Sequence, residues 1–167
     1  FSSIFSGNFL VSNIMVFFKL IISFFVIITF LTISEICYAT KIKFLSTKFN
    51  EVNVRNGPGL NHLLKYKILV EGYPLRVIDE FENWKKIEDF NGKVGWVSTS
   101  QLSIKKSIIT LTDKIYLYKF PSLNSKKIAI VEKNKVMNFI KEKEGWLLVE
   151  SNKIKGWIKK NDTWGLN

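Results

Sequence analysis

After Thr40 the chain alternates between short apolar runs and polar breaks, and it shows no long stretch of helical period. The runs are rich in β-branched and aromatic residues, and Gly, Asn and Pro separate them. Short runs of this kind between turn-forming residues are typical of strands. The pattern therefore predicts an all-β protein. In the first half of this region the predicted strands are residues 52–55, 67–70, 75–80, 84–88 and 94–97.

The pair Asn91-Gly92 separates two of these runs. An Asn-Gly pair is favoured in two-residue hairpin turns, where both central residues need positive φ. We therefore expect residues 84–88 and 94–97 to pair antiparallel, with Asn91 and Gly92 at the centre of the turn.

The two halves of this region share one pattern. Three landmarks of the first half recur in the same order in the second half. The distance from a landmark to its counterpart shortens by one residue from each landmark to the next. Loss of one residue from each of two loops explains the drift, because loops tolerate deletions. We therefore predict two repeated units, at residues 43–103 and 104–165. The paired landmarks are Pro58 and Pro121 (63 positions), Trp84 and Trp146 (62), and Gly95-Trp96 and Gly156-Trp157 (61).

Each unit is close to the lower size limit for independent folding. Five short strands of this total length are expected to curl into a small barrel, because closure removes the sheet edges that would otherwise pair with other chains. The prediction is thus two tandem five-stranded barrels, which also pack on each other.

The start of the chain has the three parts of a secretory signal. A short basic start from Met15 to Lys19 is followed by an uncharged, mostly apolar run of fourteen residues, 20–33, and by a polar end at residues 34–39. Cys37 and Ala39 are small and occupy the two positions that signal peptidase reads. We interpret residues 1–39 as a hydrophobic signal helix, with translation starting at Met15 and cleavage before Thr40, so that the remaining chain is periplasmic or secreted.

A retained membrane anchor is the alternative to a cleaved signal. A spanning helix needs about 20 apolar residues, and the charge-free run between Lys19 and Glu35 is shorter than that. Membrane contact is expected only if this segment stays attached. An N-terminus at Met15 or earlier in the purified protein would contradict cleavage.

The side chains offer little reactive chemistry after the predicted signal. The one Cys, Cys37, lies inside the signal, and His62 is the one imidazole, so no Cys-His pair or zinc ligand set is available. The acidic residues at 79–82 and 88–89 are interpreted as solvated loops rather than as paired catalytic carboxylates. We expect no catalytic residue, no metal site and no cofactor, and interpret the protein as non-catalytic.

The formal net charge of +11 is unevenly distributed. Residues 43–103 carry 9 basic and 7 acidic side chains, whereas residues 104–167 carry 14 and 6. A basic barrel rich in aromatic residues is compatible with single-stranded nucleic acid. Export argues against that partner, and the near absence of Arg among the basic residues is typical of AT-rich codon usage. A solvated basic surface, with attraction to anionic envelope polymers or lipid headgroups, is the simpler interpretation.

A set of short motifs carries a family resemblance. The first unit contains Val52-Asn53-Val54-Arg55-Asn56-Gly57-Pro58-Gly59, then Asn83-Trp84-Lys85-Lys86-Ile87, then Gly95-Trp96-Val97-Ser98. This set closely resembles the bacterial SH3-like (SH3b) domain. The second unit keeps Pro121, Trp146 and Gly156-Trp157-Ile158 but has Tyr118-Lys119-Phe120-Pro121-Ser122 in the first motif, so it resembles a degenerate copy. The whole is similar to a tandem exported type common in alphaproteobacteria.

The resemblance implies a shallow ligand groove. In SH3 barrels the Trp after the loop that precedes the third strand borders this groove, and Trp84 holds that position, with Trp146 as its counterpart. Packing of the Trp rings over a thin core is the alternative. Proline-rich ligands are not expected, because Ser98 and Gln101 stand where eukaryotic SH3 domains place a groove Pro and Tyr. The expected groove residues are Arg55, Asn56, Asn61, Tyr73, Trp84 and Trp146.

Three functions are compatible with these features. The resemblance favours an exported module that binds cell-wall peptidoglycan or its peptides. A scaffold that binds a periplasmic or other envelope protein is the second reading, and it predicts that Trp84→Ala destabilises the fold without selectively removing binding. Nucleic-acid binding is the third and is not expected; it predicts salt-dependent retention on single-stranded DNA.

Overall fold

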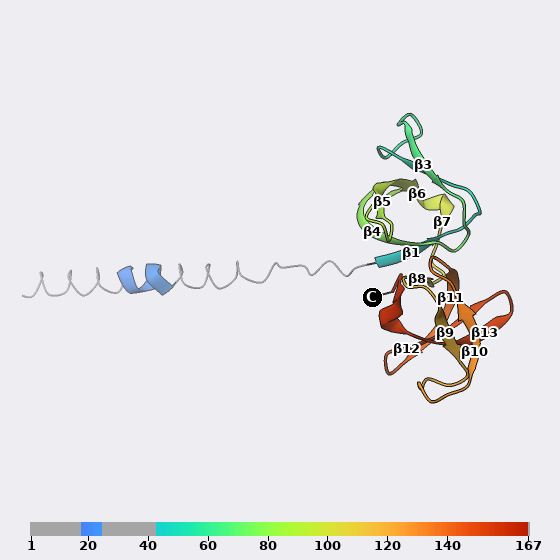
Figure 1. Cartoon of the computed structure of the whole chain (residues 1–167). Coiled ribbons are helices and arrows are strands. Elements are labelled where there is room, and N and C mark those ends of the chain that lie inside the picture. The colour runs from blue at the N-terminus through green and yellow to red at the C-terminus, as the bar shows by residue number, and fades with distance from the viewer. Residues whose placement is uncertain (1–17, 25–42, 167) are drawn as a thin grey trace, which may run out of the picture. The chain divides into compact units, whose positions relative to one another are not determined.

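The computed structural model describes residues 18–24 and 43–166 (Figure 1). Residues 18–24 are helical. Within the two described ranges, no helix combines the length and the apolar character that crossing a membrane requires. The rest of the predicted signal peptide, including Met15 and the expected cleavage site before Thr40, lies outside the described residues.

The first sheet is formed by residues 43–103 (Figure 1). Its strands are ordered β3-β2-β6-β5-β4-β1-β7, and every paired neighbour runs antiparallel. The elements are β1 (Lys43–Thr47), β2 (Val52–Arg55), β3 (Leu64–Ile68), β4 (Pro74–Phe81), β5 (Trp84–Glu88), β6 (Val94–Ser98), the 3-10 helix η1 (Thr99–Gln101) and β7 (Leu102–Ser103).

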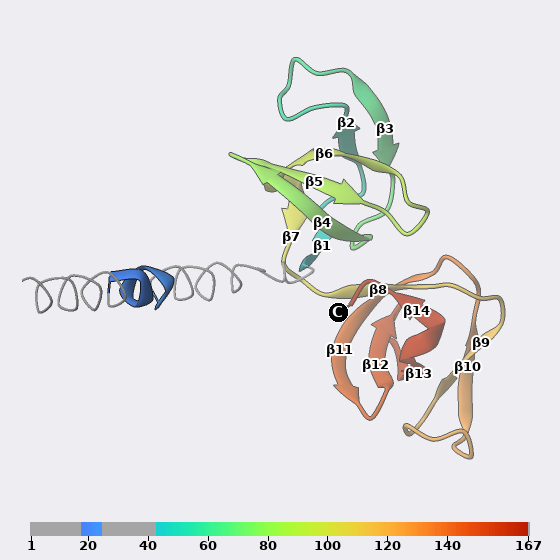
Figure 2. The same cartoon turned by 90° about the vertical axis from the view of Figure 1, so that its left-hand side faces the viewer.

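The second sheet repeats this order strand for strand (Figure 2). Its order is β10-β9-β13-β12-β11-β8-β14, so each strand is the first sheet's strand advanced by seven. The elements are β8 (Ser107–Thr110), β9 (Ile115–Tyr118), β10 (Lys127–Val131), β11 (Val136–Lys143), β12 (Trp146–Ser151), β13 (Ile154–Lys159), η2 (Lys160–Asp162) and β14 (Thr163–Trp164).

The all-β class is confirmed, and the details differ from the prediction in two ways. Each sheet has seven strands rather than five, because a strand before the first motif and a two-residue strand at the end join it. The strand pairings do not close the sheet into a barrel. The strand expected at 67–70 is β3, at Leu64–Ile68, because its pairing with β2 begins opposite Arg55. Val70 lies beyond the strand, where its carbonyl accepts a hydrogen bond from Thr47 Oγ1 at 2.6 Å.

The hairpin between β5 and β6 has the predicted antiparallel pairing but a different turn. Gly92 has positive φ, at 78°, whereas Asn91 does not. The Asp89 carboxylate accepts hydrogen bonds from the backbone N–H groups of Asn91 and Lys93, both at 2.9 Å. This side chain therefore organises a longer loop in which only Gly92 needs the left-handed conformation.

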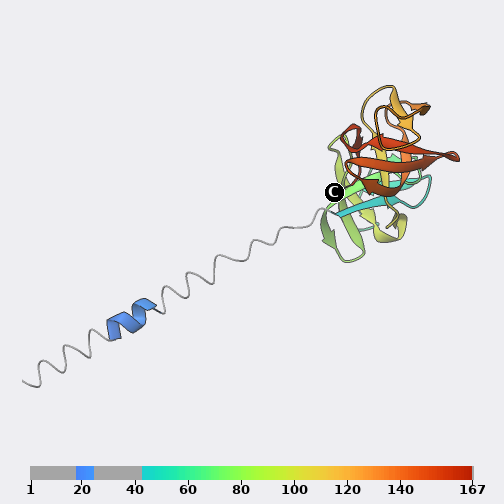
Figure 3. The same cartoon turned by 90° about the horizontal axis from the view of Figure 1, so that it is seen from below.

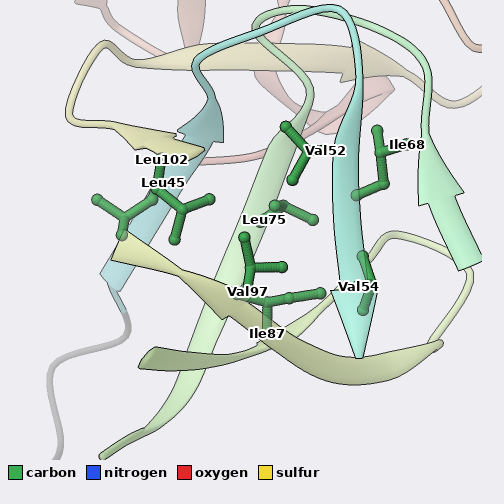
Figure 4. Packing of buried hydrophobic residues seen from close by; sticks show 8 residues of the cluster. All are labelled: Leu45, Val52, Val54, Ile68, Leu75, Ile87, Val97 and Leu102. Carbon is green, nitrogen blue, oxygen red and sulfur yellow. The ribbon is translucent and has the colours of Figure 1, made fainter. Parts of the chain in front are cut away.

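The two cores are built from matched positions. Inward residues of the first sheet converge between its strands (Figure 4), and seven of the eight matched positions also form the second core, in which Leu147 takes the place of Leu102. These small cores fit the expectation for units of this size, in which few apolar residues are available to bury. The first core holds Leu45, Val52, Val54, Ile68, Leu75, Ile87, Val97 and Leu102, and the second holds Ile108, Ile115, Leu117, Val131, Met137, Leu147, Val149 and Ile158.

A buried threonine is duplicated with its hydrogen bonds. Thr47 Oγ1 accepts from the N–H of Tyr73 at 2.8 Å while it donates to Val70. Thr110 Oγ1 accepts from the N–H of Lys135 at 2.9 Å and donates to the carbonyl of Glu132 at 2.7 Å. Each hydroxyl thus satisfies backbone groups of the loop that precedes β4 or β11, where no strand partner is present.

The glycine of each repeated Gly-Trp pair permits a close approach of two strands. A Cβ on Gly95 would lie 2.3 Å from Val54 Cγ1, and one on Gly156 would lie 2.9 Å from Leu117 Cβ. Neither glycine has positive φ. The need is therefore for space, since β6 crosses β2 and β13 crosses β9 at these points.

Residues from 42 onward form one compact unit that contains all fourteen strands and both cores. The described chain ends beside β1 (Figure 3), where the Phe44 ring meets the Trp164 ring edge-on at a centroid distance of 4.9 Å. Ser46 Oγ also donates to the carbonyl of Lys105 at 2.8 Å. The two sheets therefore contact each other, and both cores lie within residues 43–166.

Candidate functional site

A surface pocket of about 380 Å³ lies on the outer side of the first sheet. Strand β2, the loop that follows it, the start of β5 and the helix η1 each contribute to its lining. Two of the predicted groove residues, Arg55 and Trp84, meet here. The lining residues are Asn53, Arg55, Leu60, Trp84, Ser98, Ser100 and Gln101.

Trp84 is placed by the pairing of β5 with β6. It lies directly across from Ser98, and Lys86 lies across from Trp96. Side chains alternate along a strand and cross-strand partners share a face, so both Trp rings lie on the outer face of this hairpin. The inward residues are Ile87 and others of the core, to which neither Trp belongs. Trp84 is thus half-buried at the pocket.

The polar wall of the pocket is attached to the turn before Trp84. The backbone N–H of Thr99 donates to the carbonyl of Asn83 at 2.8 Å, and Thr99 Oγ1 donates to the same oxygen at 3.0 Å. These bonds hold η1 against the β4–β5 turn. Ser98 and Ser100, whose hydroxyl oxygens are 2.9 Å apart, are thereby fixed beside the Trp84 ring.

The other wall is the loop between β2 and β3, and Arg55 holds it closed. Arg55 Nη1 donates to the carbonyl of His62 at 2.8 Å, and the N–H of Asn56 donates to the carbonyl of Leu63 at 3.0 Å. The His62 ring lies so close to Gly57 that a Cβ there would be 2.5 Å from Nδ1. The absence of a side chain at Gly57 therefore leaves the space that the His62 ring occupies when the loop folds back.

An unpartnered acceptor lines the pocket. Asn53 Oδ1 is buried and has no hydrogen-bond partner, while the Asn53 backbone N–H donates to Gln101 Oε1 at 3.3 Å. Buried polar atoms in proteins are nearly always satisfied, so an unsatisfied oxygen in a residue that lines the pocket needs an explanation. The Arg55 guanidinium has further N–H groups beyond the one that binds His62.

The other predicted groove residues of the first unit do not line this pocket. Asn56 and Asn61 lie exposed in the β2–β3 loop. Tyr73 packs against the core, with its ring 6.1 Å from that of Phe90. Burial and the nearby Asp89 carboxylate raise its pKa.

A second pocket, of about 210 Å³, occupies the matched place on the second sheet. Trp146 does not line it, but its ring packs edge-on against Tyr118 at a centroid distance of 5.4 Å. Tyr118 holds the position of Arg55, so an aromatic pair replaces a cationic side chain. The matched lining residues are Tyr116 for Asn53, Tyr118 for Arg55, Leu123 for Leu60, Lys159 for Ser98 and Asp162 for Gln101.

Two acidic residues of the β4–β5 hairpin form ion pairs with basic side chains. Glu80 accepts from Lys85 Nζ at 2.5 Å and lies 3.7 Å from Lys43 Nζ, and Glu88 pairs with Arg76. The hydrogen bond from Lys85 holds the pKa of Glu80 below its ordinary value. Among the residues that the structure describes, no three His, Cys, Asp or Glu side chains gather closely enough to hold a metal ion.

The sequence reasoning missed two lining residues and discounted two. Asn53 carried a detectable signal, since it alternates with the buried Val52 and Val54 on the same side of β2 as Arg55. Ser98 and Gln101 were expected at the groove only as replacements for a Pro and a Tyr. Leu60 lies in the expected loop, between Asn56 and Asn61, whereas nothing in the local sequence indicates that Ser100 reaches the pocket, because η1 brings it there.

Residues 48–103 match the bacterial SH3 domain family, and residues 113–163 match a second description of the bacterial SH3 domain. The chain belongs to the bacterial SH3 domain family. The two matches cover the two sheets in turn, so the protein carries two bacterial SH3 domains in tandem. The pocket beside Trp84 belongs to the first SH3 domain and the pocket beside Tyr118 to the second.

Several solved structures are similar to this chain at low sequence identity. NlpC2 from Trichomonas vaginalis is 16% identical over 74% of this chain and 48% of its own, with a TM-score of 0.34. An NlpC/P60 family protein from Bacillus cereus is 15% identical over 73% and 56%, with a TM-score of 0.34. The endolysin LysPBC5 CBD is 15% identical over 75% and 94%, with a TM-score of 0.30. The chain spans about half the length of NlpC2. No curated protein matches it.

Proposed function

We propose that the protein is an exported, non-catalytic binding module whose first SH3 domain holds cell-wall peptidoglycan or its peptides in the pocket beside Trp84. Family membership supports a binding function on the cell envelope. The observation that carries the proposal is the unpartnered Asn53 Oδ1 beside a half-buried Trp84. Export is supported by the apolar run at residues 20–33 between a basic start and a polar end.

The pocket offers three kinds of contact to a short extended peptide. The Trp84 ring supplies an aromatic surface against which an aliphatic or sugar group packs. Asn53 Oδ1 accepts a ligand N–H, which relieves the cost of its burial. The remaining guanidinium N–H groups of Arg55 donate to a ligand carboxylate, and charge-assisted hydrogen bonds of this kind are about twice as strong as neutral ones. Peptides of the cell wall carry amide and carboxylate groups of this kind.

Co-sedimentation with purified insoluble peptidoglycan tests the proposal. The chain from Thr40 onward is expected to sediment with the sacculi at physiological salt. Trp84→Ala is expected to weaken binding by about tenfold or more, because loss of a central aromatic contact removes about 1.5 kcal/mol or more of binding free energy. Asn53→Leu removes the unpartnered acceptor while it keeps a similar volume, and is expected to weaken binding as well.

Trp96→Ala is the matched control, because Trp96 lies on the same face of the same hairpin but does not line the pocket. Circular dichroism and thermal unfolding establish that each variant is folded. Failure of the unmodified chain to sediment, or equal sedimentation of Trp84→Ala and Trp96→Ala, would contradict the proposal. Recovery of one crosslinked envelope protein in place of peptidoglycan would support the scaffold function instead.

A further inference from the structure

The hairpins β2–β3 and β9–β10 are structurally equivalent but differ in the side chains that they expose. Their edge strands β3 and β10 show the same succession of exposed and buried residues. The two outward positions are Lys65 and Lys67 in β3, and Ile128 and Ile130 in β10. Because the same fold position accepts Lys in one domain, the fold does not require an apolar residue there. The fold therefore does not explain why β10 exposes isoleucines at these positions.

The apolar surface continues to the end of the β9–β10 hairpin. Ile130 is 62% exposed and faces Tyr116 across the two strands. In the connecting loop Phe120 is 60% exposed and Leu123 is 57% exposed. The hairpin extends away from the body of its domain (Figure 2), so these side chains are accessible. We call this surface the apolar hairpin; its exposed residues are Tyr116, Phe120, Leu123, Ile128 and Ile130.

The charged side chains of the β9–β10 hairpin are all positive. Residues 114–131 contain four Lys and no Asp or Glu. Within the described part of the chain, none of these lysines is in an ion pair. The equivalent residues 51–68 include Glu51, which pairs with Lys67 at 2.6 Å. Two of the ammonium groups lie over aromatic rings of the apolar hairpin, Lys127 at 3.8 Å from the Tyr116 centroid and Lys119 at 5.5 Å from that of Phe120.

Five backbone N–H groups of the connecting loop donate hydrogen bonds within the hairpin. The N–H of Lys119 donates to the carbonyl of Lys126 at 2.9 Å, and that of Phe120 donates to Ser125 Oγ at 2.9 Å. The N–H groups of Ser122, Asn124 and Ser125 also donate within the loop, and Pro121 has none. A loop that enters an apolar phase must leave no polar backbone group unpaired. The loop meets that condition at these five N–H groups.

We propose that the β9–β10 hairpin docks the protein onto an anionic lipid surface. Apolar side chains enter the boundary between headgroups and acyl chains, and the lysines around them bind the negative headgroups. Lysines hold their charge at the headgroups while their stems lie along apolar surface. A second copy of the chain is the less favoured occupant, because it would bring four further unpaired lysines against the first four.

Co-sedimentation with lipid vesicles tests this docking. The chain from Thr40 onward is expected to bind vesicles made of equal parts of phosphatidylglycerol and phosphatidylcholine, but not vesicles of phosphatidylcholine alone. Phe120→Ser combined with Leu123→Ser is expected to lower the partition coefficient by about tenfold or more. Lys126→Gln combined with Lys127→Gln is expected to lower it by roughly twentyfold, since each lysine near such a surface contributes about fivefold.

Matched substitutions in the first domain are the controls. Leu63→Ser removes a leucine that is 76% exposed in the equivalent loop, and Lys65→Gln removes a lysine from the equivalent hairpin; both are expected to leave vesicle binding unchanged. Equal binding to both kinds of vesicle overturns the proposal. So does loss of binding in the lysine variant alone, because contact is then electrostatic without apolar insertion. A dimer that Ile130→Lys converts to a monomer in analytical ultracentrifugation identifies a second copy as the occupant and also overturns it.

Discussion

The two SH3 domains share a scaffold but differ at matched positions that the scaffold leaves free. Their sheets have the same strand order, and both bury a threonine that bonds to the loop before the long strand. Outside the core the domains diverge. Lys67 pairs with Glu51 on the first edge strand, whereas Ile130 stands exposed on the second. The comparison shows that the repeat constrains inward positions and hydrogen-bonded loops, and that outward positions are available for separate functions.

The pockets show the same divergence. The first presents a cation and an amide, through Arg55 and Asn53, whereas the second presents two aromatic rings, Tyr118 and Tyr116, at the same positions. Tyr118 packs edge-on against Trp146, which covers part of that ring. A ligand carboxylate therefore has a better partner in the first domain. On the edge strand beside its pocket the second domain exposes Ile128 and Ile130, where the first domain has Lys65 and Lys67.

The largest expected difference is at one inward position where the domains disagree. Leu147 is fully buried, and its equivalent is Lys85, whose ammonium group binds Glu80. Leu147→Ala is expected to lower the free energy of unfolding by about 3 kcal/mol, because it removes a buried side chain and leaves a cavity. Lys85→Ala is expected to cost less than about 1 kcal/mol, because Glu80 is half-exposed and such ion pairs contribute little.

Urea denaturation of both variants measures this difference. Glu80→Gln is the control, because it removes the ion pair and keeps Lys85 in place. A loss for Lys85→Ala as large as that for Leu147→Ala would show that the lysine stem fills the first core as leucine fills the second.

The next prediction sharpens the similarity of the domains rather than their difference. Thr47→Val and Thr110→Val keep the side-chain volume but leave one buried carbonyl and one N–H unpaired. Each is expected to lower the free energy of unfolding by about 2 kcal/mol. Thr99→Val, where the lost hydroxyl bond is exposed, is the control and is expected to cost less. Losses that differ by more than about 1 kcal/mol would contradict an equivalent role of the two threonines.

A smaller effect separates the domains at alkaline pH. Burial and the Asp89 carboxylate raise the pKa of Tyr66 from its ordinary value of 10.0 to about 12. The equivalent residue of the second domain is Ala129. The unfolded chain loses the tyrosine proton first, so the stabilisation is complete below pH 10 and is lost as pH rises from 10 to about 12.

Titration of tyrosinate absorbance measures this shift. The unmodified chain is expected to show a component with a midpoint near 12, and Tyr66→Phe is expected to remove it. Tyr116→Phe, in the second domain, is the control. A midpoint near the ordinary value for the component that Tyr66→Phe removes would contradict the prediction.

Much of the fold follows from local sequence. Periodicity and the repeated landmarks predict an all-β chain with strands at 52–55 and 84–88, because inward and outward residues alternate there. The first strand of the first sheet was missed, since its residues from Lys43 to Thr47 follow no simple alternation of exposed and buried positions. The prediction of a two-residue turn at Asn91 and Gly92 was wrong, because hydrogen bonds to the Asp89 side chain organise a longer loop there.

The candidate site was predictable only in part. Arg55 and Trp84 were expected from the family motifs, and both line the pocket. Tyr73 was expected beside them, but it packs on the core, because a sequence does not show on which side of a loop an aromatic ring falls. Leu60 reaches the pocket through the fold of a loop held by Arg55 and His62, a contact that spacing does not reveal.

The smallest expected effect tests, in a measurement without lipid, whether the fold needs the exposed isoleucines of β10. Ile130→Lys installs at the second edge strand the residue that Lys67 supplies at the first, on a side chain that is 62% exposed. The free energy of unfolding is expected to change by no more than about 0.5 kcal/mol. Val131→Lys, at the next and buried position, is the control and is expected to destabilise strongly, because it buries a charge without a partner. Equal losses for the two variants would show that β10 needs an apolar outer face to fold, and the exposed isoleucines would then be explained by stability rather than by a lipid partner.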